Sequence, residues 1–102
     1  MLKSFRTYQL AADLYRMTVP LKLPAHIKRQ LLDSTSSSAA NLAEGYGKSS
    51  SADQSRFFEI AYASCKESQA WFDLAGMSSD RPGLAADKLG AHIYRLLQSS
   101  RR

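Results

Sequence analysis

Few residues in this chain have the types and spacing that catalysis, metal binding or phosphate binding requires. Gly47-Lys48-Ser49 fits the end of a phosphate-binding loop. That motif needs its first glycine at position 42 and a strand leading into the loop, whereas this chain has Leu42 within a helical pattern. We therefore reject a nucleoside-triphosphate site and expect a solvated loop there. Binding of one phosphate or carboxylate by this basic loop is the alternative.

Metal-binding and nucleophilic side chains are also sparse. His26 and His92 are too far apart in sequence to form a local metal motif, and Cys65 is the single cysteine. Cys65 falls on an apolar stripe, where packing as a small hydrophobic side chain is the expected role. We find no nucleophile–base pair and no convincing pair of acids. The sequence predicts no catalytic residues, no metal, no cofactor and no enzymatic activity.

Charge is the most informative property of the composition. The net charge is +5, and it is segregated along the chain. Residues 1–29 carry six basic side chains against Asp13 alone, residues 88–102 carry four and no acid, and the segment between them is acidic. Both ends of the chain are therefore basic, which favours an anionic partner if the fold brings them together.

The elements that must position these residues are helices. Apolar residues recur at spacings of three and four in four segments, and no segment alternates with a period of two. Pro20 ends the first segment, Pro24 suits the first turn of the second, and Pro82-Gly83 reads as a turn before the fourth. The sequence predicts one domain over residues 1–102, with helices at about 5–19, 24–44, 52–78 and 84–98.

Short connections imply antiparallel neighbours, so the expected fold is all-α, an up-and-down antiparallel four-helix bundle. The first and fourth helices then lie side by side and merge the two basic ends into one face. At ~1.5 Å per residue the third helix would be ~40 Å long and the fourth ~22 Å. Such a mismatch would leave apolar surface uncovered and favour self-association.

Location follows from what the chain lacks. No apolar run approaches the roughly 20 residues of a membrane span, and the basic start has no continuous apolar core like that of a signal peptide. A lone cysteine excludes an internal disulfide framework. We expect a cytoplasmic protein with no membrane partner.

One helical stretch has an unusual composition, from Ser37 through Asn41 and Glu44 to Gly45. Small residues dominate it, and Glu44 occupies a last turn where basic residues are preferred. We predict that Gly45 caps the helix and that Asn41 and Glu44 clasp the corner between the second and third helices. Glu44 would accept hydrogen bonds from exposed N–H groups at the start of the third helix. A direct contact to a partner or a nucleic acid is the alternative role.

That stretch, Ser37-x-x-x-Asn41-Leu42-Ala43-Glu44-Gly45, resembles the signature of proteins encoded in intervening sequences of bacterial large-subunit (23S) rRNA genes. The run Arg56-Phe57-Phe58-x-Ile60-Ala61 and an opening helix with Phe5 and Tyr8 extend the resemblance to about Ala75. The resemblance implies a four-helix bundle assembled as a homopentamer, without established enzymatic activity. It also implies a relation to accessory proteins of diversity-generating retroelements, pentamers that bind a reverse transcriptase and nucleic acid.

The expected function is therefore that of a non-enzymatic, homo-oligomeric protein that binds RNA or DNA through its basic face. A scaffold that docks a polymerase or reverse transcriptase is the alternative. The residues expected to contact phosphates are Lys3, Arg6, Arg16, Lys22, Arg95, Arg101 and Arg102.

Overall fold

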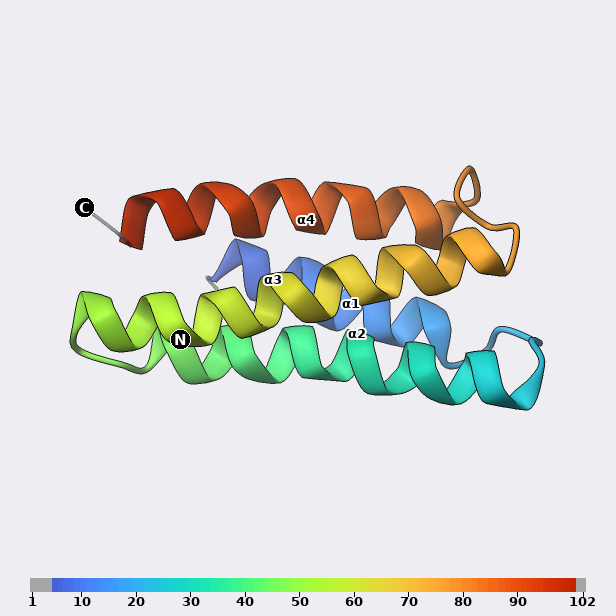
Figure 1. Ribbon diagram of the computed structural model, residues 1–102, viewed down its shortest axis with the longest axis horizontal. Coiled ribbons are helices and arrows are strands. Elements are labelled where there is room, and N and C mark those ends of the chain that lie inside the picture. The colour runs from blue at the N-terminus through green and yellow to red at the C-terminus, as the bar shows by residue number, and fades with distance from the viewer. Residues whose placement is uncertain (1–4, 101–102) are drawn as a thin grey trace.

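The computed structural model describes residues 5–100 and is entirely helical over that span. Its helices are α1 (Arg6–Thr18), α2 (Ala25–Tyr46), α3 (Ser51–Leu74) and α4 (Arg81–Ser100). They run side by side along the 40 Å axis of the molecule, each antiparallel to the next (Figure 1). Each helix packs against the next one in the chain, and α4 closes the bundle by packing against α1. The predicted up-and-down antiparallel four-helix bundle is confirmed.

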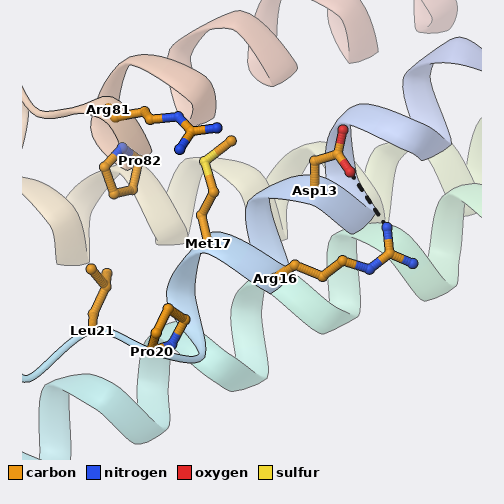
Figure 2. A pocket seen from close by; sticks show the side chains of 7 residues that line it. All are labelled: Asp13, Arg16, Met17, Pro20, Leu21, Arg81 and Pro82. Atoms are coloured by element: carbon orange, nitrogen blue, oxygen red, sulfur yellow. Dashed lines mark hydrogen bonds and ion pairs between the residues drawn. The ribbon is translucent and has the colours of Figure 1, made fainter.

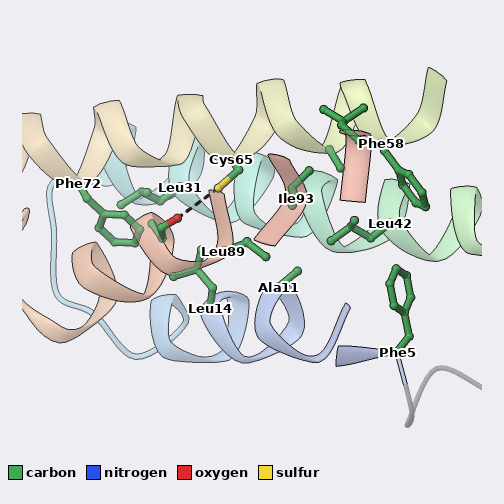
Figure 3. Close-up of a cluster of buried hydrophobic side chains, with 13 residues drawn as sticks. Phe5, Ala11, Leu14, Leu31, Leu42, Phe58, Cys65, Phe72, Leu89 and Ile93 are labelled. Atoms are coloured by element: carbon green, nitrogen blue, oxygen red, sulfur yellow. Dashed lines mark hydrogen bonds between the residues drawn. The ribbon is translucent and has the colours of Figure 1, made fainter. Parts of the chain in front are cut away.

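The core is formed by the apolar stripes that the sequence pattern predicts. Its largest fully buried side chains include Leu14 of α1, Leu31 and Leu42 of α2, Phe72 of α3 and Ile93 of α4. Figure 3 shows these side chains converging between the four helices. Burial of one such side chain stabilises the folded state by roughly 1.5–3 kcal/mol, so this stripe supplies the main driving force for folding.

Small side chains let α2 and α3 approach closely. Ser34 and Ser38 of α2 are buried and face α3. The Ser68 hydroxyl donates to Ser34 Oγ at 2.8 Å, and the Ser38 hydroxyl donates to the carbonyl of Ala61 at 3.2 Å. Between them, the hydroxyls of residues 37 and 64 lie 2.8 Å apart. The serines that look like a low-complexity loop by composition therefore form a helix–helix contact.

Gly45 has a different role from the predicted helix cap. Helix α2 continues through Tyr46, and the capping position falls on Gly47. Gly45 is buried, and a Cβ built on it would lie 2.6 Å from Cε1 of Phe58. The ring of Tyr46 stacks on Phe5, with 4.4 Å between centroids, which extends the core to this end of the bundle. Gly45 therefore serves close packing between α2 and α3.

The end of α3 and the start of α4 differ from the expected positions. Gly76 has φ +73°, and the N–H groups of Gly76 and Met77 donate to the carbonyls of Asp73 and Phe72. This is a Schellman motif, which ends α3 at Leu74 instead of 78. Pro82 lies in the first turn of α4, a position that proline favours, so the Pro-Gly pair starts a helix there.

Helix α4 therefore has 20 residues against the 24 of α3. At ~1.5 Å per residue these lengths are ~30 Å and ~36 Å, so α4 covers most of α3. The expected mismatch between the two helices, and the argument for self-association drawn from it, are wrong. The short helix is α1, with 13 residues.

Candidate functional site

The contact between α1 and α4 brings basic residues from both ends of the chain onto one side of the bundle. On α4, positions 81, 88, 92 and 95 repeat at spacings of three, four and seven residues and so share one flank of the helix. Arg6 comes from the start of α1. Arg16, ten residues later, is rotated by about 80° around the helix and also lines a hollow with Ser36 and Ala43 of α2. We call Arg6 and the α4 set the α1–α4 basic strip, and its members are Arg6, Arg81, Lys88, His92 and Arg95.

One end of the strip borders a groove of about 630 Å³ between α1 and the start of α4. Figure 2 shows Arg81 extending over Met17, while Arg16 turns away to an ion pair with Asp13. The Arg16 Nη1 and Asp13 Oδ1 atoms are 3.4 Å apart and both side chains are exposed, so this pair contributes little to stability. Arg81 makes no such pair with any residue in 5–100, and its charge is available at the groove.

His92 lies at the other end of the strip and is half-buried. Burial lowers its pKa below the ordinary value, and the cations Arg95, Lys88 and Arg6 lower it further. Arg6 belongs to α1, so cations of both helices act on this one imidazole. The strip therefore holds a local concentration of positive charge.

Several cations on this side of the bundle have no paired acid. Within residues 5–100, the ion pairs are Arg16 with Asp13, Lys48 with Glu44 and Arg56 with Asp53. None of the described acids forms an ion pair with Lys88 or Arg95. Such uncompensated cations attract anions, and several along one helix suit a polyanion.

The predicted phosphate contacts fall in different places. Arg6 and Arg95 are exposed on the α1–α4 basic strip, Arg16 is exposed on the α2 side of α1, and Lys22 is exposed in the connection after α1. The sequence prediction missed Arg81, Lys88 and His92, which the shared α4 flank could have revealed through their spacing. Three further predicted contacts lie outside the described residues, and they are Lys3, Arg101 and Arg102.

The predicted clasp at the α2–α3 corner is not formed as expected. Glu44 is exposed, and its carboxylate pairs with Lys48 at 3.5 Å. The α3 N-terminus is capped instead by Ser50, whose hydroxyl accepts from the Asp53 N–H. The Asn41 amide donates to the carbonyl and hydroxyl of Ser37 within its own helix. Asn41 and Glu44 thus make no described side-chain hydrogen bond to α3.

Both residues lie on a side of the bundle that also carries an exposed apolar stripe. Ile60 and Leu74 of α3 are 42% and 70% exposed, and Phe57 and Trp71 are partly exposed. The positions 57, 60, 71 and 74 fall on one helical stripe, and residue 64 between them contacts α2. We call these four residues the α3 stripe. Exposed apolar side chains in such a row are typical of a protein contact surface.

The other side chains considered for catalysis or phosphate binding, Cys65 and Lys48, are held in packing, hydrogen-bond or ion-pair contacts. Cys65 is fully buried, its thiol donates to the carbonyl of Ala86 at 3.4 Å, and burial raises its pKa to about 12. It packs as the predicted small hydrophobic residue. Lys48 is held by Glu44 and by the ring of Phe57, so it does not complete a phosphate loop. Among residues 5–100, no group of histidine, cysteine and acidic side chains could hold a metal ion.

Comparison with known proteins identifies the family. The model of the 23S rRNA-intervening sequence protein family matches residues 5–81. The chain belongs to this family. The match covers α1, α2 and α3 and ends at the first residue of α4. The strip residues Lys88, His92 and Arg95 therefore lie beyond the part that the 23S rRNA-intervening sequence family model matches.

Neither the curated proteins nor the solved structures include a match to this chain. In the part of this 23S rRNA-intervening sequence family member that the structure describes, each helix is too short or too polar to cross a bilayer.

Proposed function

We propose that this protein is a non-enzymatic, cytoplasmic nucleic-acid-binding protein that holds RNA or DNA phosphates on the α1–α4 basic strip. The observation that carries the proposal is the gathering of cations from α1 and α4, where Arg6, Lys88 and Arg95 form no ion pair with any acid among residues 5–100. Along α4, Arg81, Lys88 and Arg95 are separated by seven residues each, or ~10 Å. A row of this kind follows a phosphate backbone and contains no element that reads bases, so we expect binding by charge and shape.

Salt dependence gives the quantitative test. Four or five neutralised phosphates on a single strand imply a slope of about −3 to −3.5 in log affinity against log salt. Affinity for a labelled uridine oligonucleotide should then fall about a hundredfold between about 50 mM and about 200 mM salt. Fluorescence anisotropy measures this directly, and an affinity that stays constant over the range would refute the proposal.

A charge-matched pair of variants locates the site. The variant Arg95→Gln should weaken binding about threefold and reduce the magnitude of the salt slope by about 0.7. Arg56→Gln removes a cation that is paired with Asp53 and stacked on Phe57 outside the strip. It should leave binding nearly unchanged. Equal losses in the two proteins would mean that net charge, and not the strip, binds the oligonucleotide.

We also propose that the protein self-associates through the α3 stripe, and the homopentamer that the family resemblance implies is the expected assembly. Support comes from the exposure of Ile60 and Leu74 on a face without a covering helix. Sedimentation or light scattering should give an oligomer for the natural protein and a smaller species for Ile60→Glu. A monomeric natural protein would refute self-association without affecting the strip.

The α3 stripe also supports the second candidate function, a scaffold for a polymerase or reverse transcriptase like those bound by retroelement accessory proteins. Such a partner should remain bound after nuclease treatment and should be lost in Leu74→Glu, whose side chain is 70% exposed in the natural protein. Binding that disappears on nuclease treatment would favour nucleic acid as the direct ligand.

A further inference from the structure

The surroundings of His92 are more specific than a general basic surface. Lys88 and Arg95 lie one turn before and one turn after it on the same flank of α4. Across the α1–α4 contact, Arg6 also acts on the imidazole. Lys88 and Arg95 thus flank His92 on one face of α4, and Arg6 follows Phe5, which lines a hollow with Leu96 and Ser99 of α4.

Within residues 5–100, the carboxylates of α1 and α4 form no ion pair with these three cations. On α1, Asp13 pairs with Arg16, two turns away from Arg6. On α4, Asp87 lines a separate hollow with Tyr62 and Lys66 of α3. Among residues 5–100, the charged groups that lower the pKa of His92 are Arg95 and Lys88 from its own helix and Arg6 from α1, and all are cations. These cations disfavour protonation of the imidazole in the free protein, although the position suits an anion.

We propose that Arg6, Lys88, His92 and Arg95 form a binding site for one phosphate group of the nucleic acid, which His92 contacts in its protonated form. The inference rests on the proposed function and makes one site of the strip proton-linked. A phosphate oxygen accepts the imidazolium N–H, and the phosphate charge offsets the three cations that otherwise oppose protonation. No bond other than the N–H changes, and the proton comes from solvent.

Proton uptake on binding fixes the sign of the pH dependence. The pKa of His92 is lowered in the free protein, and bound phosphate raises it. Affinity should rise as the pH falls through the raised pKa of the complex, and it should become constant below the lowered pKa of the free protein. For each unit between the two values of the pKa, affinity should gain up to about tenfold.

The test measures affinity for the uridine oligonucleotide from about pH 8 to about pH 6 at constant salt, across the range in which histidine titrates. The natural protein should bind more tightly at the lower pH. His92→Gln should remove the pH dependence, whereas His26→Gln, which changes an exposed histidine of α2, should retain it. A pH dependence that survives in His92→Gln would overturn the inference, as would tight binding that does not change with pH.

A measurement on the natural protein separates this inference from the proposed function. Titration of the His92 ring resonances by NMR should show a higher pKa with sulfate present, since sulfate keeps its charge over this range and mimics a phosphate group. An unchanged His92 pKa at saturating sulfate would refute the site. If the oligonucleotide fails to bind but sulfate raises the pKa, the anion site stands and the nucleic-acid function falls.

Discussion

Gly45→Ala is the substitution whose outcome the structure determines most sharply. Alanine is ordinarily the better helix former, by about 1 kcal/mol. At this position, however, the added Cβ would lie 2.6 Å from Cε1 and 2.8 Å from Cδ1 of Phe58, and 3.1 Å from Cβ of Phe57. Carbon atoms in contact prefer separations of ~3.5–4 Å, so the overlap is about 1 Å.

The surrounding core limits how far the ring can retreat. Phe58 is 3% exposed, and its ring lies against that of Phe5 with 6.4 Å between centroids. Overpacking of this kind costs about 1–3 kcal/mol, from which the gain in helix propensity is subtracted. The overlap of about 1 Å with a buried ring places the cost in the upper half of that range, so we expect a net loss of about 1–2 kcal/mol in the free energy of unfolding.

Thermal denaturation followed by circular dichroism provides the assay. For a domain of this size, a loss of about 1–2 kcal/mol lowers the Tm by about 5–15 °C. Gly47→Ala is the matched control, since its Cβ would meet nothing closer than the Glu44 carbonyl oxygen at 3.6 Å. That variant should melt at or slightly above the natural protein. If Gly45→Ala melts as high as Gly47→Ala, close packing against Phe58 does not explain the glycine.

The remaining predictions concern three residues away from the strip. Gly76→Ala should lower the free energy of unfolding in urea by about 1 kcal/mol, because its φ of +73° is strained for alanine. Cys65 should resist thiol reagents at about pH 8 until the protein is denatured, since it is fully buried and has its pKa raised to about 12. The raised pKa of Cys65 also makes the free energy of unfolding depend on pH. Its contribution is complete below pH 9.0 and is lost as the pH rises towards about 12, and Cys65→Ala should not show this decrease in stability. Glu44→Gln should change the Tm by little, since the exposed ion pair of Glu44 with Lys48 contributes at most about 1 kcal/mol. A large decrease in the Tm would mean that Glu44 does stabilise the corner between α2 and α3.

The parts of the fold that depend on repeated patterns could be predicted from the sequence. Apolar spacing gave the four helices and the buried positions, because every member of a stripe contributes to the same signal. The segregation of charge, combined with the up-and-down topology, also placed α1 and α4 together on a basic face. These properties do not depend on any single residue.

Single glycines and prolines were harder to interpret, because the same residue serves different geometries. Gly45 fitted a helix cap, but its role depends on Phe58, which only tertiary packing brings to it. Gly76 lay within a periodic pattern, although its positive φ ends α3. Pro82-Gly83 reads equally well as a turn or as a first helical turn.

The candidate site was also predicted only in part. Arg6 and Arg95 were predicted because they belong to basic ends of the chain. Lys88 belongs to the same basic end but was left out, and His92 was not counted as a cation, although their spacing from Arg95 places all three on one flank of α4. Which neighbouring helix that flank borders is fixed only in the bundle. The role of Glu44 was predicted wrongly, because an acid in the last turn of a helix was expected to accept hydrogen bonds from the start of the next helix.

The serines between α2 and α3 have a consequence for how uniquely the two helices align. Apolar contacts between small side chains tolerate sliding, whereas hydroxyl groups bond only at particular offsets. The pairs 34–68 and 37–64 fix the same antiparallel alignment, and a shift by one turn would separate both. Their replacement by alanine would preserve the close approach but allow neighbouring alignments to compete. These hydroxyl pairs therefore fix one alignment of α2 against α3, the two longest helices of the bundle.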